Sequence, residues 1–246
     1  MNNWNTPAEE SINLKDNEVH IWLFQLNTSP HAINNFYTFL SNDEKKRSER
    51  LINFMHRKRF ISFHGFMRSV LTRYTSTPEH KLSFKTIENG KPCLIDNHNN
   101  IQFNLSHSHN MALLGICKNN EIGVDIEHID RDNNWQGIIR RFFTQTEQQN
   151  IFSLPEERQK LAFFETWTRK EAHMKVTGKG LLLSPTQFTV STPPENARLI
   201  DCPYDTTIKP EDWSMREITM PSSASNYCGC LSRHGIITEI NHYLYK

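Results

Sequence analysis

Short strand-like segments, separated by turns that contain Asn and Gly, occupy residues 81–117 and limit the folds open to this chain. The segments are 81–85, 101–105 and 111–117. Antiparallel strands can be joined by tight turns, whereas parallel strands need a crossover of a dozen or more residues, usually a helix. The segments therefore predict a meander and not an alternating βαβ pattern.

Helical patterns lie on both sides of this meander. The capping-box pattern at 41–44 predicts a helix that begins near Asn42. Apolar residues recur every three or four positions over 60–74, and a longer helix is expected over 156–177, ended by Gly178 and Gly180. Further helices are expected at 33–40, 135–143 and 146–154, and strands at 19–26, 122–127, 188–190, 213–220, 227–232 and 236–240.

A polar turn at 118–121 separates two segments that each open with a strand. The length of 246 residues allows one large domain or two small lobes. We therefore predict an N-terminal lobe over 1–119 and a C-terminal lobe over 120–246.

The composition favours a soluble protein and excludes several classes of partner. The formal net charge is +1, so nothing indicates a nucleic-acid partner. The longest apolar runs, 19–26 and 111–117, fall short of the ~20 residues that span a bilayer. The N-terminus shows neither the basic nor the apolar region of a secretion signal. We expect a cytoplasmic protein that binds no membrane.

The cysteines form an odd and scattered set, which is unlike a disulfide framework. We expect them to be reduced residues of the packed interior: Cys93, Cys117, Cys202, Cys228 and Cys230.

Asp125 and Glu127 are expected on one face of the strand at 122–127, because alternate residues of a strand point to the same side. Their Cβ atoms would lie roughly 6–7 Å apart, which lets both carboxylates bind one hard cation. A solvated strand face is the alternative reading of the same pattern.

Two charged residues of the long helix, Glu171 and Lys175, lie on the same side of the helix as its apolar residues. A charge on the core side of a helix needs a partner, because burying an isolated charge is very costly. Glu171 could join Asp125 and Glu127 in an oxygen-rich pocket suited to Mg²⁺, whereas zinc would prefer nitrogen and sulfur ligands. The alternative is a simple pair of residues four apart on a helix, worth ~0.2–0.5 kcal/mol.

Two other segments carry groups that could bind phosphate. Ser106 and His107 follow a strand end, where a hydroxyl and an imidazole can donate hydrogen bonds. In the turn at 89–92, Gly90 would let backbone amides approach a ligand while Lys91 supplies a charge. An exposed hairpin turn is the alternative for the second segment.

The segments that carry these groups also form a recognisable set. They are Gly-Lys-Pro at 90–92, Asn-Leu-Ser-His at 104–107, Gly-Val-Asp-Ile-Glu at 123–127, the Phe-containing segment 140–147 and Trp-Thr-Arg-Lys-Glu-Ala-His-Met-Lys at 167–175. In this order and spacing they resemble the Sfp-type 4′-phosphopantetheinyl transferases, over about residues 43–181. The resemblance implies the α+β fold class: a monomer of two pseudo-symmetric lobes, each a small antiparallel sheet packed with helices, with coenzyme A between them.

The resemblance also implies residue roles. Asp125, Glu127 and Glu171 match the magnesium ligands of the family, and Lys175 matches its phosphate-contacting lysine. Residues implied to line the coenzyme A site are Gly90, Lys91, Pro92, Ser106, His107, Lys170 and Lys175.

Arg47 falls where members of the family often hold the 3′-phosphate of the nucleotide with a basic residue. Lys45, Lys46 and Arg50 are alternatives for that role.

The implied reaction is attack by a serine of an apo acyl or peptidyl carrier protein on the phosphorus nearest the pantetheine, with 3′,5′-ADP as the leaving group. Mg²⁺ and Lys175 would neutralise the pyrophosphate, beside His107. The proton of the serine could pass to Glu171, to Glu147 or to a metal-bound water. Glu147 also completes a capping box with Thr144, which is a structural alternative.

The resemblance further implies an apolar surface near the cleft that binds a carrier helix. An apolar stripe at 135–142 has that character, and the same residues could instead be core: Trp135, Ile138, Ile139 and Phe142.

Two other functions compete with this one: a magnesium-dependent nuclease, and a non-catalytic protein that binds coenzyme A or carrier proteins. A role in secondary metabolism follows from the resemblance alone, and the carrier served is not predicted.

Overall fold

The computed structural model describes residues 4–7, 12–86, 90–130, 134–178, 183–204 and 209–245. The elements of the first half are β1 (Trp4–Asn5), β2 (Glu18–Gln25), α1 (Pro30–Phe39), α2 (Asn42–Glu49), α3 (Phe54–Thr75), β3 (Phe84–Thr86), β4 (Pro92–Leu94), β5 (Ile101–Ser108) and β6 (Met111–Lys118). The elements of the second half are β7 (Ile122–His128), α4 (Trp135–Phe142), α5 (Gln145–Phe152), α6 (Glu156–Thr177), β8 (Thr189–Val190), β9 (Leu199–Asp201), β10 (Trp213–Glu217), β11 (Tyr227–His234) and β12 (Glu239–Leu244). Short 3₁₀ turns lie at Glu79–Lys81, Pro185–Gln187, Pro210–Asp212 and Ser222–Ala224.

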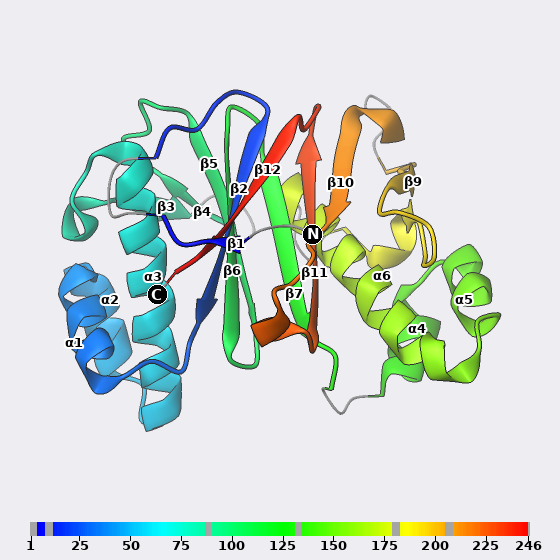
Figure 1. Cartoon of the computed structure of the whole chain (residues 1–246), viewed down its shortest axis with the longest axis horizontal. Coiled ribbons are helices and arrows are strands. Elements are labelled where there is room, and N and C mark those ends of the chain that lie inside the picture. Colours follow the sequence, from blue (N-terminus) through cyan, green and yellow to red (C-terminus); the bar gives the residue numbers. More distant parts are fainter. Residues whose placement is uncertain are drawn as a thin grey trace.

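Small sheets lie between two groups of helices, which confirms the predicted α+β class. One sheet has the order β1-β12-β2-β6-β5 and another has the order β10-β11-β7. Two-stranded pairs, β3-β4 and β8-β9, complete the strands of the described residues. Helices α1, α2 and α3 lie on one side of the sheets, and α4, α5 and α6 lie on the other side (Figure 1).

The larger sheet is mixed rather than purely antiparallel. Strand β12, near the C-terminus, runs parallel to both β1 and β2, whereas β2, β6 and β5 pair in antiparallel fashion. The boundary between residues 119 and 120 stays a prediction, and β12 crosses it. It separates the two groups of helices, but residues 239–244 cross into the sheet of the first half.

Local signals in the sequence set several helix ends. The side chains of Ser41 and Glu44 bond each other's backbone N–H groups at the start of α2, as the capping-box pattern predicts. Helix α6 spans the expected residues and ends at Gly178, which has a left-handed conformation. Gly180 lies outside the described residues.

The core of the first half is rich in aromatic residues. Trp22 is fully buried, and the ring of Phe24 stacks on that of Phe66 of α3 with centroids 4.7 Å apart. Tyr245 packs on Phe24 from beyond the end of β12, with centroids 5.5 Å apart. Residues from both ends of the chain thus stabilise one core.

The five cysteines are free thiols, as expected. Burial raises the pKa of Cys117 to about 11 and also raises the pKa of Cys228. Across the described ranges, none of the helices has the length and apolar character needed to cross a bilayer.

Candidate functional site

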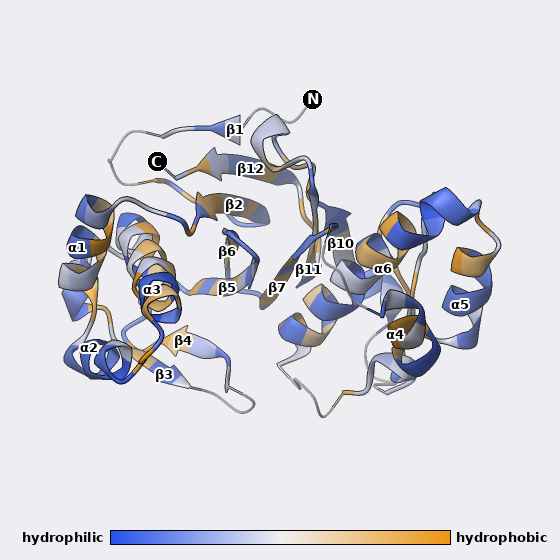
Figure 2. Cartoon of the chain, turned by 90° about the horizontal axis from the view of Figure 1, so that it is seen from below, coloured by the Kyte–Doolittle hydropathy of each residue, from blue (hydrophilic) through white to orange (hydrophobic). Residues whose placement is uncertain are grey.

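Strands β5 and β7 belong to different sheets but are joined through side chains. Asn104 Oδ1 accepts a hydrogen bond from the backbone N–H of Val124 at 2.9 Å, and Ser108 Oγ accepts one from that of His128 at 3.1 Å. Asn104 and Ser108 lie on the same face of β5, and β5 lies beside β7 (Figure 2). We call this contact between the two halves the interlobe seam.

The two carboxylates of β7 point into the interlobe seam. Ser106 Oγ donates a hydrogen bond to Asp125 Oδ1 at 2.8 Å, and Ser108 Oγ donates one to Glu127 Oε2 at 2.7 Å. Asp125 is only 4 % exposed. A solvated strand face is therefore not the explanation for the Asp-x-Glu pattern.

Helix α6 packs closely on β7 because residue 123 is glycine. A Cβ atom at Gly123 would lie 2.1 Å from the carbonyl oxygen of Ala172 and 2.5 Å from the backbone nitrogen of Val176. These are backbone atoms of α6, so they cannot rotate away. Gly123 therefore fixes the distance between the strand that carries Asp125 and the helix that carries Lys175.

The close packing brings Lys175 into the interlobe seam. Its Nζ donates to Asp125 Oδ1 at 2.6 Å, to Ser106 Oγ at 2.8 Å and to the carbonyl oxygen of Val124 at 3.2 Å. The side chain of Lys175 remains 27 % exposed. An ammonium group is thus held at the surface by three partners from the other elements of the seam.

Glu171 lies one helical turn before Lys175 and shares the electrostatic field of the same carboxylates. The pKa of Glu171 is raised to about 7, first by burial and then by the negative charge of Asp125, against the opposing effect of Lys175. Glu127 raises this pKa as well. The three predicted acids therefore interact across the seam, although they lie far apart in the sequence.

The oxygen donors of the seam suit a hard cation. Asp125 Oδ2 is buried and has no hydrogen-bond partner in the part of the chain that the structure describes. Asp125 Oδ1 bonds Lys175, and Glu127 bonds Ser108. In this arrangement no three His, Cys, Asp or Glu side chains of the described ranges form a group that could hold a metal ion. The three-carboxylate magnesium site stays a prediction.

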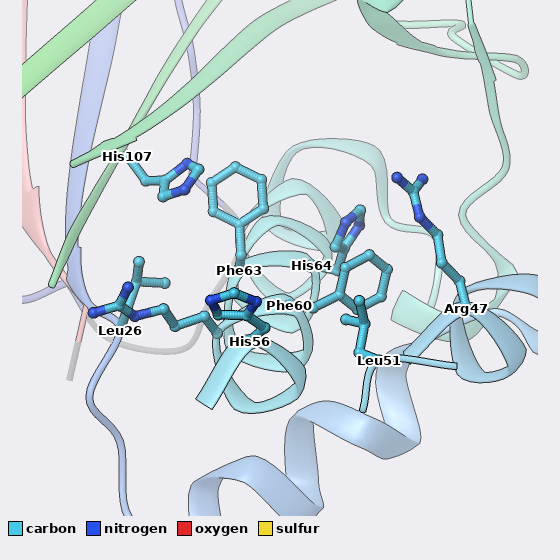
Figure 3. Close-up of a pocket in the computed structure, with 9 residues that line it drawn as sticks. Leu26, Arg47, Leu51, His56, Phe60, Phe63, His64 and His107 are labelled. Atoms are coloured by element: carbon cyan, nitrogen blue, oxygen red, sulfur yellow. The ribbon is translucent and has the colours of Figure 1, made fainter. Parts of the chain in front are cut away.

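A basic cavity of about 400 Å³ opens beside the seam (Figure 3). It lies between α2, α3 and β5, and none of the described residues that line it is an Asp or a Glu. Its cationic or ionisable lining residues are Arg47, His56, Arg59, His64 and His107, and its apolar ones are Leu26, Leu51, Phe60 and Phe63. Of the four basic residues considered on α2 and after it, only Arg47 lines this cavity.

A second cavity of about 460 Å³ shares Arg59 and His107 with the first and adds Glu127. The two cavities therefore adjoin and reach the interlobe seam. The pKa of His107 is lowered, first by burial and then by the positive charges of Lys175 and Arg59. His107 is thus in the electrostatic field of Lys175.

The predicted phosphate-binding turn is anchored differently from the expectation. Gly90 has a φ of +89°, which glycine adopts without strain. Lys91 forms an ion pair with Glu121 and donates to the carbonyl oxygen of Ile122 at 3.2 Å. Neither Lys91 nor Pro92 lines the two cavities described above. Asn89 lies outside the described residues.

Glu147 and Lys170 form a fully buried ion pair away from the cavities. Lys170 Nζ donates to both carboxylate oxygens of Glu147, at 2.7 and 2.8 Å, and to the carbonyl oxygen of Phe188 at 2.9 Å. Both side chains are 0 % exposed. Glu147 also completes the capping box of α5 with Thr144. The assignments of Glu147 as a base and Lys170 as a coenzyme A contact are therefore corrected to a structural role.

Part of the apolar stripe of α4 belongs to the core. Ile139 is fully buried, and the ring of Phe142 lies 6.1 Å from that of Trp167 of α6. Trp135 and Ile138 pack against the same cluster. Ile139 is therefore core, whereas Trp135, Ile138 and Phe142 are only partly buried, and a carrier-binding role for them stays a prediction.

Sequence reasoning missed several basic and polar residues of the site. Arg59 and His64 of α3 both line the first cavity. In the sequence they are five residues apart among apolar residues and belong to no motif. Ser108, two residues after Ser106, could have been found from the alternation of β5.

The chain matches two family models. The one described as "4'-phosphopantetheinyl transferase superfamily" covers residues 121–231, and the one described as "4'-phosphopantetheinyl transferase, N-terminal" covers residues 25–118. The two matches meet at the predicted polar turn, so together they span both halves of the seam.

Individual relatives bear names of the same kind. The chain is 32% identical to the 4'-phosphopantetheinyl transferase HetI of Nostoc sp. (strain PCC 7120), over 86% of this chain and 87% of that protein. It is 30% identical to the 4'-phosphopantetheinyl transferase Sfp of Bacillus subtilis (strain 168), over 63% of this chain and 67% of that protein.

A solved structure matches part of the chain. It is a holo-(acyl-carrier-protein) synthase from Bacillus anthracis str. Ames in complex with CoA (3',5'-ADP), with 18% identity and a TM-score of 0.36. The match covers 47% of this chain and 96% of that chain. A TM-score of this size does not establish a common fold.

Proposed function

The chain belongs to the 4′-phosphopantetheinyl transferase family, and we propose that it transfers the 4′-phosphopantetheine group of coenzyme A to a serine of an apo carrier protein. The single observation that carries the proposal is the interlobe seam. There Lys175, Asp125 and Glu171 meet beside a basic cavity, so groups able to bind a pyrophosphate adjoin groups able to bind a nucleotide phosphate.

The basic cavity is the proposed site for the phosphorylated nucleotide of coenzyme A. Arg47, Arg59 and His107 supply donors for a phosphate, and the absence of acidic lining residues among those described favours an anion. The aromatic rings of Phe60 and Phe63 provide apolar surface for the rest of the nucleotide. Gly90, Lys91, Pro92 and Ser106 remain proposed contacts at the edge of the site.

The donors of the seam fit Mg²⁺, which prefers carboxylate oxygens and substrate phosphates. Asp125, Glu127 and Glu171 would hold it, and the buried, unpartnered Asp125 Oδ2 supports this assignment. When bound, the cation would neutralise charge on the pyrophosphate.

The chain's own residues account for the remaining steps. Lys175 contacts the pyrophosphate and stabilises the negative charge that develops on the leaving group. The serine oxygen forms a bond to the phosphorus nearest the pantetheine, and the bond from that phosphorus to the bridging oxygen breaks. The serine proton passes to the Glu171 carboxylate, and 3′,5′-ADP leaves.

Both faces of the seam come from one chain, which supports a monomer as the active unit. Size-exclusion chromatography with light scattering tests this point. A monomer that carries full activity is the expected result, and activity confined to an oligomer would contradict it.

The experiment that tests the function incubates the protein with coenzyme A, Mg²⁺ and a panel of apo acyl and peptidyl carrier proteins. Intact-mass spectrometry then weighs each carrier. We expect a mass gain of one phosphopantetheine on at least one carrier, and no gain on the variant of that carrier in which the reactive serine is alanine. No gain on any carrier would contradict the proposal.

A further inference from the structure

The turn between α2 and α3 presents large apolar side chains to solvent. Ile52 is 99 % exposed, Phe54 is 69 % exposed and Met55 is 48 % exposed. They account for half of the six large apolar side chains that are exposed in the described residues. Contiguous exposed apolar residues are typical of interaction sites, whereas single ones need no explanation.

Hydrogen bonds hold this turn in place. Arg57 of α3 donates to the carbonyl oxygens of Leu51 and Glu49, at 3.2 and 3.0 Å. Asn53 Oδ1 accepts from the backbone N–H groups of Met55 and His56, at 2.9 and 3.1 Å. The apolar side chains are therefore presented by an ordered turn, and little conformational entropy would be lost when a partner covers it.

At the start of α3, directly after the turn, all charged side chains are basic. This helix of 22 residues contains no Asp or Glu, and Arg57, Lys58 and Arg59 lie in its first two turns. The N-terminus of a helix is already the positive end of its dipole, so basic residues there cost stability rather than add it. Arg57 holds the turn, and Arg59 bonds Asn110 beside the cavity. Lys58, together with Arg50 at the end of α2, is therefore the charge that favours a negatively charged partner.

The position of the turn connects it to the proposed active site. Leu51 and His56, on either side of the exposed residues, line the basic cavity that His107 also lines. In the apolar stripe of α4, by contrast, Ile139 is core and Trp135, Ile138 and Phe142 pack against that core. The turn is therefore an apolar surface that a protein delivering its serine to the seam can reach.

We propose that the α2–α3 tip, defined as Arg50, Ile52, Phe54, Met55 and Lys58, docks the carrier protein through a helix whose apolar residues are flanked by carboxylates. The proposal rests on the proposed function and adds the surface that selects the partner. Aromatic residues, Met and Arg are the side chains enriched in protein–protein interfaces. The ring of Phe54 with Lys58 Nζ 5.5 Å from its centroid is one such mixed apolar and cationic contact.

The test compares Ile52→Asp and Lys58→Glu with the control Ile236→Asp. Ile236 is also largely exposed, at 72 %, but lies between β11 and β12, outside the proposed site. Circular dichroism first checks that all three variants are folded. The probe is an acidic apo acyl carrier protein, and transfer kinetics give separate KM values for the carrier and for coenzyme A.

We expect each tip variant to raise the KM for the carrier by about 10-fold or more, with the KM for coenzyme A unchanged and the control like wild type. Calorimetric binding of the same carrier with its reactive serine replaced by alanine should weaken in parallel. Binding of the carrier to the wild-type protein should also weaken when the NaCl concentration rises from about 0.05 M to about 0.3 M, because the contact is partly ionic.

Two results would overturn the docking surface. In the first, wild type transfers the group, but the KM for the carrier is the same in wild type, in both tip variants and in the control. The proposed function would then stand without the docking surface. The other is binding of wild type to anionic phospholipid vesicles, lost in Ile52→Asp, with carrier binding unaffected, which would assign the tip to a membrane surface. Absence of any transfer by wild type would contradict the function, while the calorimetric comparison would still decide the docking surface.

Discussion

At the scale of the residue, two lysines of α6 that are five positions apart have opposite surroundings. Lys170 is fully buried on Glu147, and burial lowers the pKa of Lys170 to about 8 despite that partner. Lys175 reaches the surface of the interlobe seam and bonds Asp125. A motif that contains both lysines cannot separate these roles, because the difference comes from what packs against each side of the helix.

We predict that Lys170→Met destabilises the fold strongly. The substitution leaves the carboxylate of Glu147 buried with no cation, and breaking a buried pair in this way costs about 3–5 kcal/mol. Urea unfolding followed by circular dichroism measures the change. The double variant Lys170→Met with Glu147→Leu should recover part of the loss, and a single variant as stable as wild type would contradict the structural role.

Glu44 gives a prediction for the dependence of stability on pH. Burial opposes its ionisation, but hydrogen bonds from His64 and Arg68 outweigh this and lower the pKa of Glu44 to about 2. A carboxyl with a lowered folded pKa adds stability that is fully present above its unfolded value, near 4.5, and is lost as the pH falls towards the folded value.

The difference in unfolding free energy between wild type and Glu44→Gln should therefore shrink as the pH falls below about 4.5, from about 2 kcal/mol at neutral pH. Urea titrations over this range, with both proteins at each pH, give the difference directly. A difference that stays constant with pH would show that Glu44 carries no ionic interaction.

At the scale of the element, the packing of α6 on β7 positions the site. Alternation along β7 predicted correctly that Asp125 and Glu127 share a face, because that period depends only on the strand. Alternation could not show that this face is buried, since the cover comes from β5, which precedes it in the chain, and from Lys175 of α6. Predicting those contacts requires the packing of three elements.

Gly123→Ala tests the packing of α6 on β7. The added methyl would meet backbone atoms of Ala172 and Val176, so α6 must shift, and we expect a loss of about 1–3 kcal/mol in stability together with lower transfer activity. Gly137→Ala in α4 is the control, because the added methyl there meets the side chain of Asn134, the N-cap of α4, and so disturbs a helix end rather than the packing of α6 on β7. Equal effects of the two substitutions on activity would contradict the positioning role of Gly123.

At the scale of the whole molecule, the chain closes on itself through β12. The sequence predicts a strand near residues 236–240, but its partners are β1 and β2, more than 200 residues earlier. Local patterns carry no information on pairing at that separation, so the prediction of two lobes divided at residue 119 missed the exchange. The separation of helices into two groups, in contrast, follows chain order (Figure 1).

Deletion of residues 239–246 should therefore unfold the first half as well as the second. It would leave β1 without its neighbour, expose the paired edge of β2 and remove Tyr245 from the aromatic core. Thermal unfolding followed by near-ultraviolet circular dichroism should show no cooperative transition for the truncated chain. A cooperative transition like that of wild type would contradict the exchange of β12.

In the proposed function, the carboxylates of the interlobe seam, and not the buried Glu147, serve phosphopantetheine transfer. The most direct measurement is the rate at which a carrier gains mass with Glu171→Gln and with Glu147→Gln, at a temperature at which circular dichroism shows both to be folded. We expect Glu171→Gln to be slower than wild type by at least about 10²-fold and Glu147→Gln to transfer in proportion to its folded fraction. Wild-type transfer by folded Glu171→Gln, or loss of transfer by folded Glu147→Gln, would contradict the account.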